Sequence, residues 1–203
     1  MCYTFAMKKL RSLSAKVALT GKRVLVRVDW NIPLHAQAEP EASLKIERSL
    51  ETIRWLQKKK TIVILLTHIG RPEKRDRKHS TGHLIGLLRD VYGFSVEHHS
   101  ESVSVASERK GLKKKLESAD PGSLHLLENV RFEEGEEKNA KSLAKAYAEL
   151  GEMFVNDAFA SCHRAHTSVV GIAELLPSYA GRSLLEEVQA LQKLISHPKK
   201  PMV

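Results

Sequence analysis

Short apolar runs alternate along this chain with longer stretches in which apolar residues recur at helical spacing. The apolar runs predict strands at Lys22–Trp30, Thr61–Thr67, Leu124–Leu127 and Met153–Val155, with a weaker strand at Phe94–His98. Helices are expected around Ile46, Leu50, Ile53 and Leu56, over Leu84–Tyr92, Ser102–Ser118 and Leu184–Ile195, and from an Asn139 cap to Leu150. This alternation predicts an α/β fold: a three-layer, Rossmann-like domain whose mainly parallel sheet is covered by helices on both faces.

Polar and charged side chains follow each of the four strong strand candidates. The residues concerned are Asp29, Asn31 and Pro33; His68, Gly70, Arg71 and Pro72; Glu128, Asn129 and Arg131; and Asn156, Asp157, His163, Arg164 and His166. In a parallel sheet these segments emerge at one edge, where open α/β folds bind their ligands. Three of the loops each deliver an arginine, whose planar fork suits carboxylate or phosphate. The pattern predicts a basic cleft for a small, multiply charged anion.

Composition agrees with an anionic partner but does not choose one. The 203 residues include 33 Lys and Arg against 24 Asp and Glu, a net charge of +9, which suits nucleic acid, a membrane surface or small phosphates. No run is apolar enough to span a bilayer, and Met1–Ala6 lacks the order of a secretory signal; Met7 is a second plausible start. With only Cys2 and Cys162 we expect no disulfide framework, and we expect a soluble, cytoplasmic protein.

Each candidate also has a simpler interpretation. Taken singly, Arg71, Arg131 and Arg164 would more often be surface salt-bridge partners; their shared position after strands favours a site. His163 and His166, beside Cys162, have a spacing that can hold a metal, but no second ligand pair is evident, so no metal site is expected. Four glutamates are expected to form a solvated face, namely Glu133, Glu134, Glu136 and Glu137. The basic loop 74–78 could touch nucleic acid, but sparse aromatics and the lack of a known motif argue against it.

At these loops the sequence resembles one family, phosphoglycerate kinase. Five segments match its motifs in order: Val26-Arg27-Val28-Asp29-Trp30-Asn31-Ile32-Pro33, Thr67-His68-Ile69-Gly70-Arg71-Pro72, Leu126-Leu127-Glu128-Asn129-Val130-Arg131-Phe132, Gly135-Glu136-Glu137-Lys138-Asn139, and Val155-Asn156-Asp157-Ala158-Phe159 with His163-Arg164-Ala165-His166. The resemblance extends from about Leu10 to Val203 and covers the family's N-terminal half.

The resemblance implies reversible phosphoryl transfer between 1,3-bisphosphoglycerate and ADP, giving 3-phosphoglycerate and ATP with magnesium. Residues 10–183 would form the phosphoglycerate-binding domain, residues 1–9 a flexible N-terminus, and residues 184–203 a helix leading to the interdomain hinge. By motif, Asp29 and Asn31 would contact the carboxylate and hydroxyl end of the substrate. The phosphate and neighbouring oxygens would be bound by His68, Arg71, Arg131 and Arg164, with His166 in support. Arg164 is also a candidate catalytic residue.

Two departures from the family pattern stand out. Lys45 with Ile46 occupies the place of an arginine–isoleucine pair whose arginine is linked to the transferring phosphoryl group; lysine keeps the charge but loses the fork. Lys45 is therefore a substrate-binding and catalytic candidate, and a slower kinase is expected. The Gly-Gly-Ala-Lys nucleotide motif does not occur, so we expect Mg-ATP or Mg-ADP to bind a C-terminal lobe that this chain lacks, and no residue here is assigned to a cofactor or metal.

Three functions remain open at this point. In the first, the chain is a phosphoglycerate kinase fragment, which is expected to be monomeric and inactive alone and could be completed by a separate C-terminal lobe. In the second, it is a non-catalytic phosphoglycerate- or anion-binding domain that descends from the enzyme as a decayed paralogue. In the third, it is a nucleic-acid binder. Lys45 and the missing motif favour the second, whereas the complete set of loop residues favours the first. Neither nucleic acid nor membrane is the expected partner.

Overall fold

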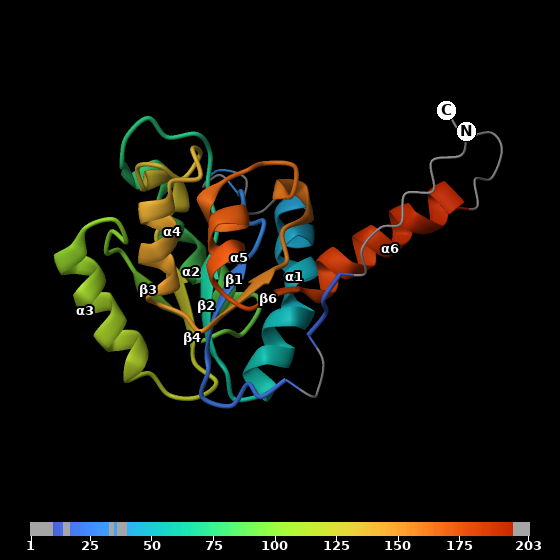
Figure 1. Cartoon of the computed structure of the whole chain (residues 1–203), viewed down its shortest axis with the longest axis horizontal. Helices are drawn as coiled ribbons and strands as arrows, with labels where there is room; N and C mark the ends of the chain where they lie inside the picture. Colours follow the sequence, from blue (N-terminus) through green and yellow to red (C-terminus); the bar gives the residue numbers. More distant parts are fainter. Residues whose placement is uncertain (1–9, 14–16, 33–34, 36–39, 197–203) are drawn as a thin grey trace.

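The computed structural model describes residues 10–13, 17–32, 35 and 40–196 (Figure 1). Its strands are β1 (Arg23–Arg27), β2 (Ile62–Leu66), β3 (Glu97–His99), β4 (Leu124–Leu127), β5 (Met153–Asn156) and β6 (Ser178–Ala180). Its α-helices are α1 (Pro40–Lys58), α2 (Leu84–Asp90), α3 (Ala106–Glu117), α4 (Lys141–Ala148), α5 (Ile172–Leu175) and α6 (Arg182–Ser196). Pro33, Cys2 and the termini 1–9 and 197–203 lie outside the described residues.

These strands form one sheet in the order β3-β4-β2-β1-β5-β6, and every neighbouring pair is parallel. Parallel strands need crossover connections, and helices supply most of them. Because all the strands point the same way, the loops after β1, β2, β4 and β5 leave the sheet at a single edge. The predicted parallel α/β architecture is confirmed.

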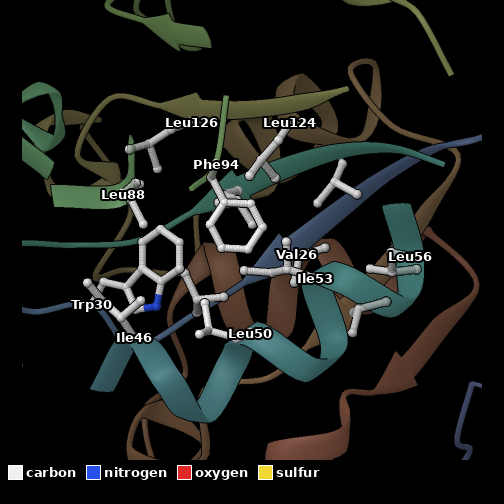
Figure 2. Packing of buried hydrophobic residues seen from close by; sticks show 14 of the residues in the cluster. Val26, Trp30, Ile46, Leu50, Ile53, Leu56, Leu88, Phe94, Leu124 and Leu126 are labelled. Carbon is white, nitrogen blue, oxygen red and sulfur yellow. The ribbon is translucent and has the colours of Figure 1, made fainter. Parts of the chain in front are cut away.

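The two faces of the sheet are covered by different helices. One core cluster joins alternate strand residues to α1 and α2, and Figure 2 shows Trp30, Ile46, Leu50, Ile53 and Phe94 gathered there. The other cluster joins the remaining strand residues to α3, α4 and α5. Strand residues in β2 and β4 are buried on both sides, which explains why β2 is a continuous apolar run and β4 is apolar except at His125, rather than alternating with polar residues.

Helix α6 packs beside α1 at its start and then extends from the body of the molecule (Figure 1). The helix begins at Arg182, two residues before its predicted start at Leu184. In its last turns Leu191, Leu194 and Ile195 are exposed. Among the described helices, none is long and apolar enough to cross a bilayer.

Several predicted boundaries need correction. The first strand ends at Arg27 rather than Trp30, because beyond Val28 the chain turns the Trp30 ring into the core, where its indole N–H donates to Ser49 Oγ at 2.8 Å. Asn139 does not cap α4: the N-cap is Ala140, and Asn139 adopts a left-handed conformation with a φ of 51°. The prediction missed β6, α5 and the π-helical turn Thr167–Gly171.

Candidate functional site

Arg131 links two of the loops at the carboxyl edge of the sheet. It lies in a short 3-10 turn after β4, Val130–Phe132, and its Nη1 donates to the carbonyl oxygen of Gly70 in the loop after β2. Gly70 has a φ of +63°, and a Cβ there would lie 2.4 Å from the His79 ring, so this loop conformation requires glycine. Although its side chain is only 5% exposed, Arg131 has, among the described residues, a single carboxylate in ion-pair range, that of Glu137 at 3.4 Å.

Arg71 and Arg164 surround Arg131 with further positive charge. Burial lowers the pKa of Arg131, and the charges of Arg164 and Arg71 lower that pKa further. Arg71 is exposed, and Arg164 is half-buried, with its Nε 3.2 Å from His163 Nε2. The positive charges of the three predicted arginines therefore influence one another in one region of the site. We call this region the basic rim (Arg71, Arg131, Arg164 and the neighbouring His68). An excess of like charge at one place is relieved by a bound anion.

His68 contributes a neutral ring to the basic rim. Burial lowers the pKa of His68 to about 2, with further lowering by the neighbouring charges of Arg27 and Arg131. Its Nδ1 lies 3.0 Å from Arg27 Nη2, and guanidinium groups only donate, so Nδ1 accepts and the ring proton sits on Nε2. The ring is therefore a fixed hydrogen-bond donor rather than a cation.

Arg27, which holds His68, was not among the predicted site residues. It is the last residue of β1 and is 1% exposed. Its Nε donates to Ser168 Oγ at 3.0 Å, and its Nη1 donates to the carbonyl oxygen of Val28. Burial lowers the pKa of Arg27, whereas the carboxylate of Glu136 opposes this shift. An arginine at the end of an otherwise apolar strand was the signal available in the sequence.

The expected solvated face of glutamates is wrong at two of its four positions. Glu134 and Glu137 are exposed, but Glu136 is 1% exposed and Glu133 is 8% exposed. Glu136 accepts hydrogen bonds from Ser168 N at 3.0 Å and from Ser168 Oγ at 2.5 Å. Glu133 accepts from Val103 N at 2.8 Å and from Ser104 N at 3.0 Å. Both carboxylates satisfy backbone groups of segments about 30 residues away, which a local charge pattern does not reveal.

His166 lies near the same buried carboxylate. Its Nδ1 is 4.0 Å from Glu136 Oε1. Burial lowers the pKa of His166, and the nearby charges of Arg131 and Arg164 act in the same direction. The structure thus brings His166 close to the basic rim, beside the groups that brace it.

Asn31 and Lys45 connect the loop after β1 to the basic rim. Asn31 Oδ1 accepts a hydrogen bond from Gly70 N at 2.8 Å, and its backbone oxygen accepts one from Lys45 Nζ at 3.0 Å. Asp29 and Lys45 both line a small cavity of about 40 Å³, together with Asp157. Seven of the eight predicted residues follow β1, β2, β4 or β5 at this edge of the sheet, and the eighth, Lys45, comes from α1 and reaches the edge through Asn31.

Glu128 and Asn129 prove to be braces for the loops. Asn129 is 1% exposed, and its Nδ2 donates to the carbonyl oxygens of Ile69 and His79, both at 2.8 Å. Glu128 accepts from Thr81 N and from Ser80 Oγ, also both at 2.8 Å. These contacts fix the loop between Gly70 and Thr81 against β4.

Within the described part of the chain, the basic rim gathers no group of three metal-ligating side chains, and Cys162, His163 and His166 do not form one. The rim is a site of fixed donors and positive charge. Guanidinium groups of this kind suit a small anion with phosphate or carboxylate groups.

Comparison with known proteins gives one consistent result. A family model described as phosphoglycerate kinase matches residues 14–203. The chain is 45% identical over 188 residues to a phosphoglycerate kinase of Bartonella quintana, covering 92% of this chain and 46% of the relative. It is 44% identical over 195 residues to a phosphoglycerate kinase of Thermus thermophilus, covering 96% and 47%. The structure of phosphoglycerate kinase from Coxiella burnetii matches with a TM-score of 0.78 at 34% identity, over 95% of this chain and 46% of that one. The chain spans about half the length of the curated relatives it matches.

Proposed function

The chain belongs to the phosphoglycerate kinase family, and from this premise we propose that it supplies the phosphoglycerate-binding half of an enzyme that transfers a phosphoryl group between 1,3-bisphosphoglycerate and ADP. The observation that carries the proposal is the convergence of Arg71, Arg131 and Arg164 beside the neutral ring of His68. In this proposal residues 10–183 form the binding domain, and residues 184–203 lead toward the hinge.

The proposed roles follow from the chemistry of each group. The three guanidinium groups bind the substrate phosphate, because each can present two parallel N–H donors to it. His68 adds a neutral donor through Nε2, held in place by Arg27. Asp29 and Asn31 take the hydroxyl and carboxylate end of the substrate, where Asp29 accepts from the hydroxyl and the Asn31 amide donates. His166 supports the rim.

Lys45 and Arg164 are the proposed catalytic residues. Phosphoryl transfer asks the protein mainly to position the reactants and to stabilise the charge on the transferring group. Lys45 would supply a point charge where the family has an arginine, and its bond to the Asn31 carbonyl sets where that charge lies. Mg-ATP or Mg-ADP would be the cosubstrate, bound by a nucleotide lobe on the same or a separate chain. The described rim residues supply phosphate-binding donors and no carboxylate cluster for the magnesium ion, so we assign no residue here to it.

A non-catalytic phosphoglycerate-binding domain is the second candidate, and lysine at position 45 is the observation that favours it. Adding a C-terminal lobe of a relative separates the two candidates: restored kinase activity supports the enzyme, and binding without activity supports the domain. A monomeric state and a cytoplasmic location stay predictions.

Calorimetric titration tests the proposal. We expect 3-phosphoglycerate to bind the chain at one equivalent and ATP to give no saturable heat. Arg164→Ala should weaken the 3-phosphoglycerate isotherm, and Arg89→Ala is the matched control, because Arg89 is exposed on α2 and pairs with Asp90 at 2.7 Å. Binding of ATP but not of 3-phosphoglycerate would refute the assignment.

A further inference from the structure

A buried histidine interrupts the apolar strand β4. His125 stands among three leucines in Leu124–Leu127 and is 3% exposed. It is the register partner of Ile64 in β2, which belongs to the core cluster under α3 and α4. A polar ring on such a face requires polar partners, because an unpaired buried donor or acceptor is costly.

The edge strand β3 supplies those partners. Glu97 is the register partner of His125, and His99 follows two residues later, so both side chains lie on the same sheet face as His125. His99 is 1% exposed, whereas the Glu97 side chain is 59% exposed. The three residues lie on the face covered by α3 and take no part in the basic rim.

The ligand atoms of these three side chains form a small triangle. His99 Nε2 lies 3.0 Å from His125 Nδ1. Each oxygen of the Glu97 carboxylate lies near one of the two rings: Oε1 is 3.8 Å from His99 Nε2, and Oε2 is 3.6 Å from His125 Nδ1. Two ligands of a tetrahedral zinc ion, each about 2.0 to 2.1 Å from the metal, lie roughly 3.3 Å apart. The observed edges of the triangle bracket that value.

We propose that Glu97, His99 and His125 bind a divalent transition-metal ion, with Zn²⁺ as the ion that the ligand set fits. Two imidazoles and one carboxylate leave a fourth position open toward solvent at the exposed Glu97. Imidazole nitrogens favour zinc and its neighbours in the first transition series over the hard ions Mg²⁺ and Ca²⁺, which prefer oxygen. The site goes beyond the proposed kinase function and does not depend on it.

A hydrogen bond to a neighbouring hydroxyl orients one of the two rings. Ser123 Oγ lies 2.8 Å from His125 Nε2, so an N–H at Nε2 can donate a hydrogen bond to the hydroxyl, which leaves the Nδ1 lone pair free to bind the metal. His99 Nε2, which lies 3.0 Å from His125 Nδ1, binds the metal in the tautomer whose proton is on Nδ1.

The charges around the site permit a cation. Glu97 is its carboxylate ligand, and Glu101 and Lys115, whose charges both act on His99, pair with each other at 2.6 Å. Glu97 and His125 also line a surface groove of about 510 Å³, which gives an ion access from solvent. Bound metal would cross-link the three-residue edge strand β3 to β4 and so stabilise this edge of the sheet, where β3 has three register partners.

Zinc titration of the whole chain tests the proposal. We expect one equivalent of Zn²⁺ to bind and raise the melting temperature, while Mg²⁺ does neither. Glu97→Gln should weaken zinc binding at least about tenfold, and His99→Leu should abolish it. Ser123→Ala should weaken it about tenfold to a hundredfold, as is typical when a group orienting a ligand is removed. Co²⁺ should give the visible absorption of a four-coordinate ion, and this absorption should be lost in the same variants.

His163→Asn is the matched control, because His163 is exposed and belongs to the competing pair His163 and His166. Its zinc affinity should stay within about twofold of the wild type. Failure of His99→Leu to fold would leave the test intact, since Glu97 is an exposed side chain whose replacement does not disturb the core. Zinc binding that survives Glu97→Gln unchanged, that is lost in His163→Asn, or that is absent from the wild type would overturn the proposal.

Discussion

Replacement of Glu136 by glutamine should destabilise the protein severely, although the sequence presents this residue as one of a solvated run. Glu136 is 1% exposed, and its carboxylate is the strongest of the neighbouring charges that raise the pKa of the buried Arg27 guanidinium. The two charges are bridged by Ser168 Oγ, which accepts from Arg27 Nε at 3.0 Å and donates to Glu136 Oε1 at 2.5 Å. Because both hydrogen bonds share Ser168 Oγ, Arg27 Nε and Glu136 Oε1 are no more than 5.5 Å apart.

The size of the effect follows from that distance. At an effective dielectric constant of about 20, two unit charges at this separation attract by about 3 kcal/mol. Loss of one partner of a buried pair costs about 3 to 5 kcal/mol, because the other charge is left uncompensated. Burial raises the pKa of Glu136 and lowers that of Arg27, so desolvation opposes the pair, and the net loss should lie at the lower end of this range.

Urea unfolding of Glu136→Gln measures the loss directly. Glu134→Gln is the matched control, because Glu134 is exposed two residues away, and it should change the free energy of unfolding by less than about 0.5 kcal/mol. Arg27→Met combined with Glu136→Gln should recover part of the loss, since no unpaired charge then remains. Equal free energies of unfolding for the two glutamine variants would refute the account of the buried pair.

Three further predictions concern the site and its support. Arg131→Lys keeps the charge but loses the fork, so affinity for 3-phosphoglycerate should fall about tenfold to a hundredfold by calorimetry; an unchanged affinity would remove Arg131 from the site. Lys45→Arg, in a protein joined to a nucleotide lobe, should raise kcat about tenfold or more, and no gain would sink the proposed role of position 45. Burial raises the pKa of Asp157 to about 6, so its contribution to stability is present at low pH and is lost as pH rises through about 6. Relative to the wild type, Asp157→Asn should therefore be more stable at about pH 8 than at about pH 4, by roughly 2 kcal/mol in unfolding free energy, and an equal difference at both pH values would contradict this.

The sequence predicted the sheet well because its central strands are buried on both faces. The continuous apolar run at β2 and the three leucines of β4 predict buried strands, and polar loop residues mark where these strands end. The edge strand β6 was missed because Ser178–Ala180 has no apolar run; it forms a strand through pairing with β5. Tertiary context decided that element, and local propensity did not.

The position of the basic rim could be predicted because the parallel strands bring its arginines to one edge of the sheet, regardless of which groups their side chains contact. The buried residues that support the rim could not be predicted. The burial of Glu136 depends on Ser168, 32 positions later, and the fixed tautomer of His68 depends on Arg27, 41 positions earlier. The proposed metal ligands could not be predicted either, because His99 and His125 stand 26 positions apart and meet only through the register of β3 and β4. A charged or polar residue inside an apolar strand, such as Arg27 or His125, is the local signal for such partners.

The most direct test of the central claim is a crystal structure of this chain with 3-phosphoglycerate. We expect the phosphate within hydrogen-bonding distance of at least two of Arg71, Arg131 and Arg164. A phosphate bound on another surface, with these guanidinium groups facing solvent separately, would contradict the account.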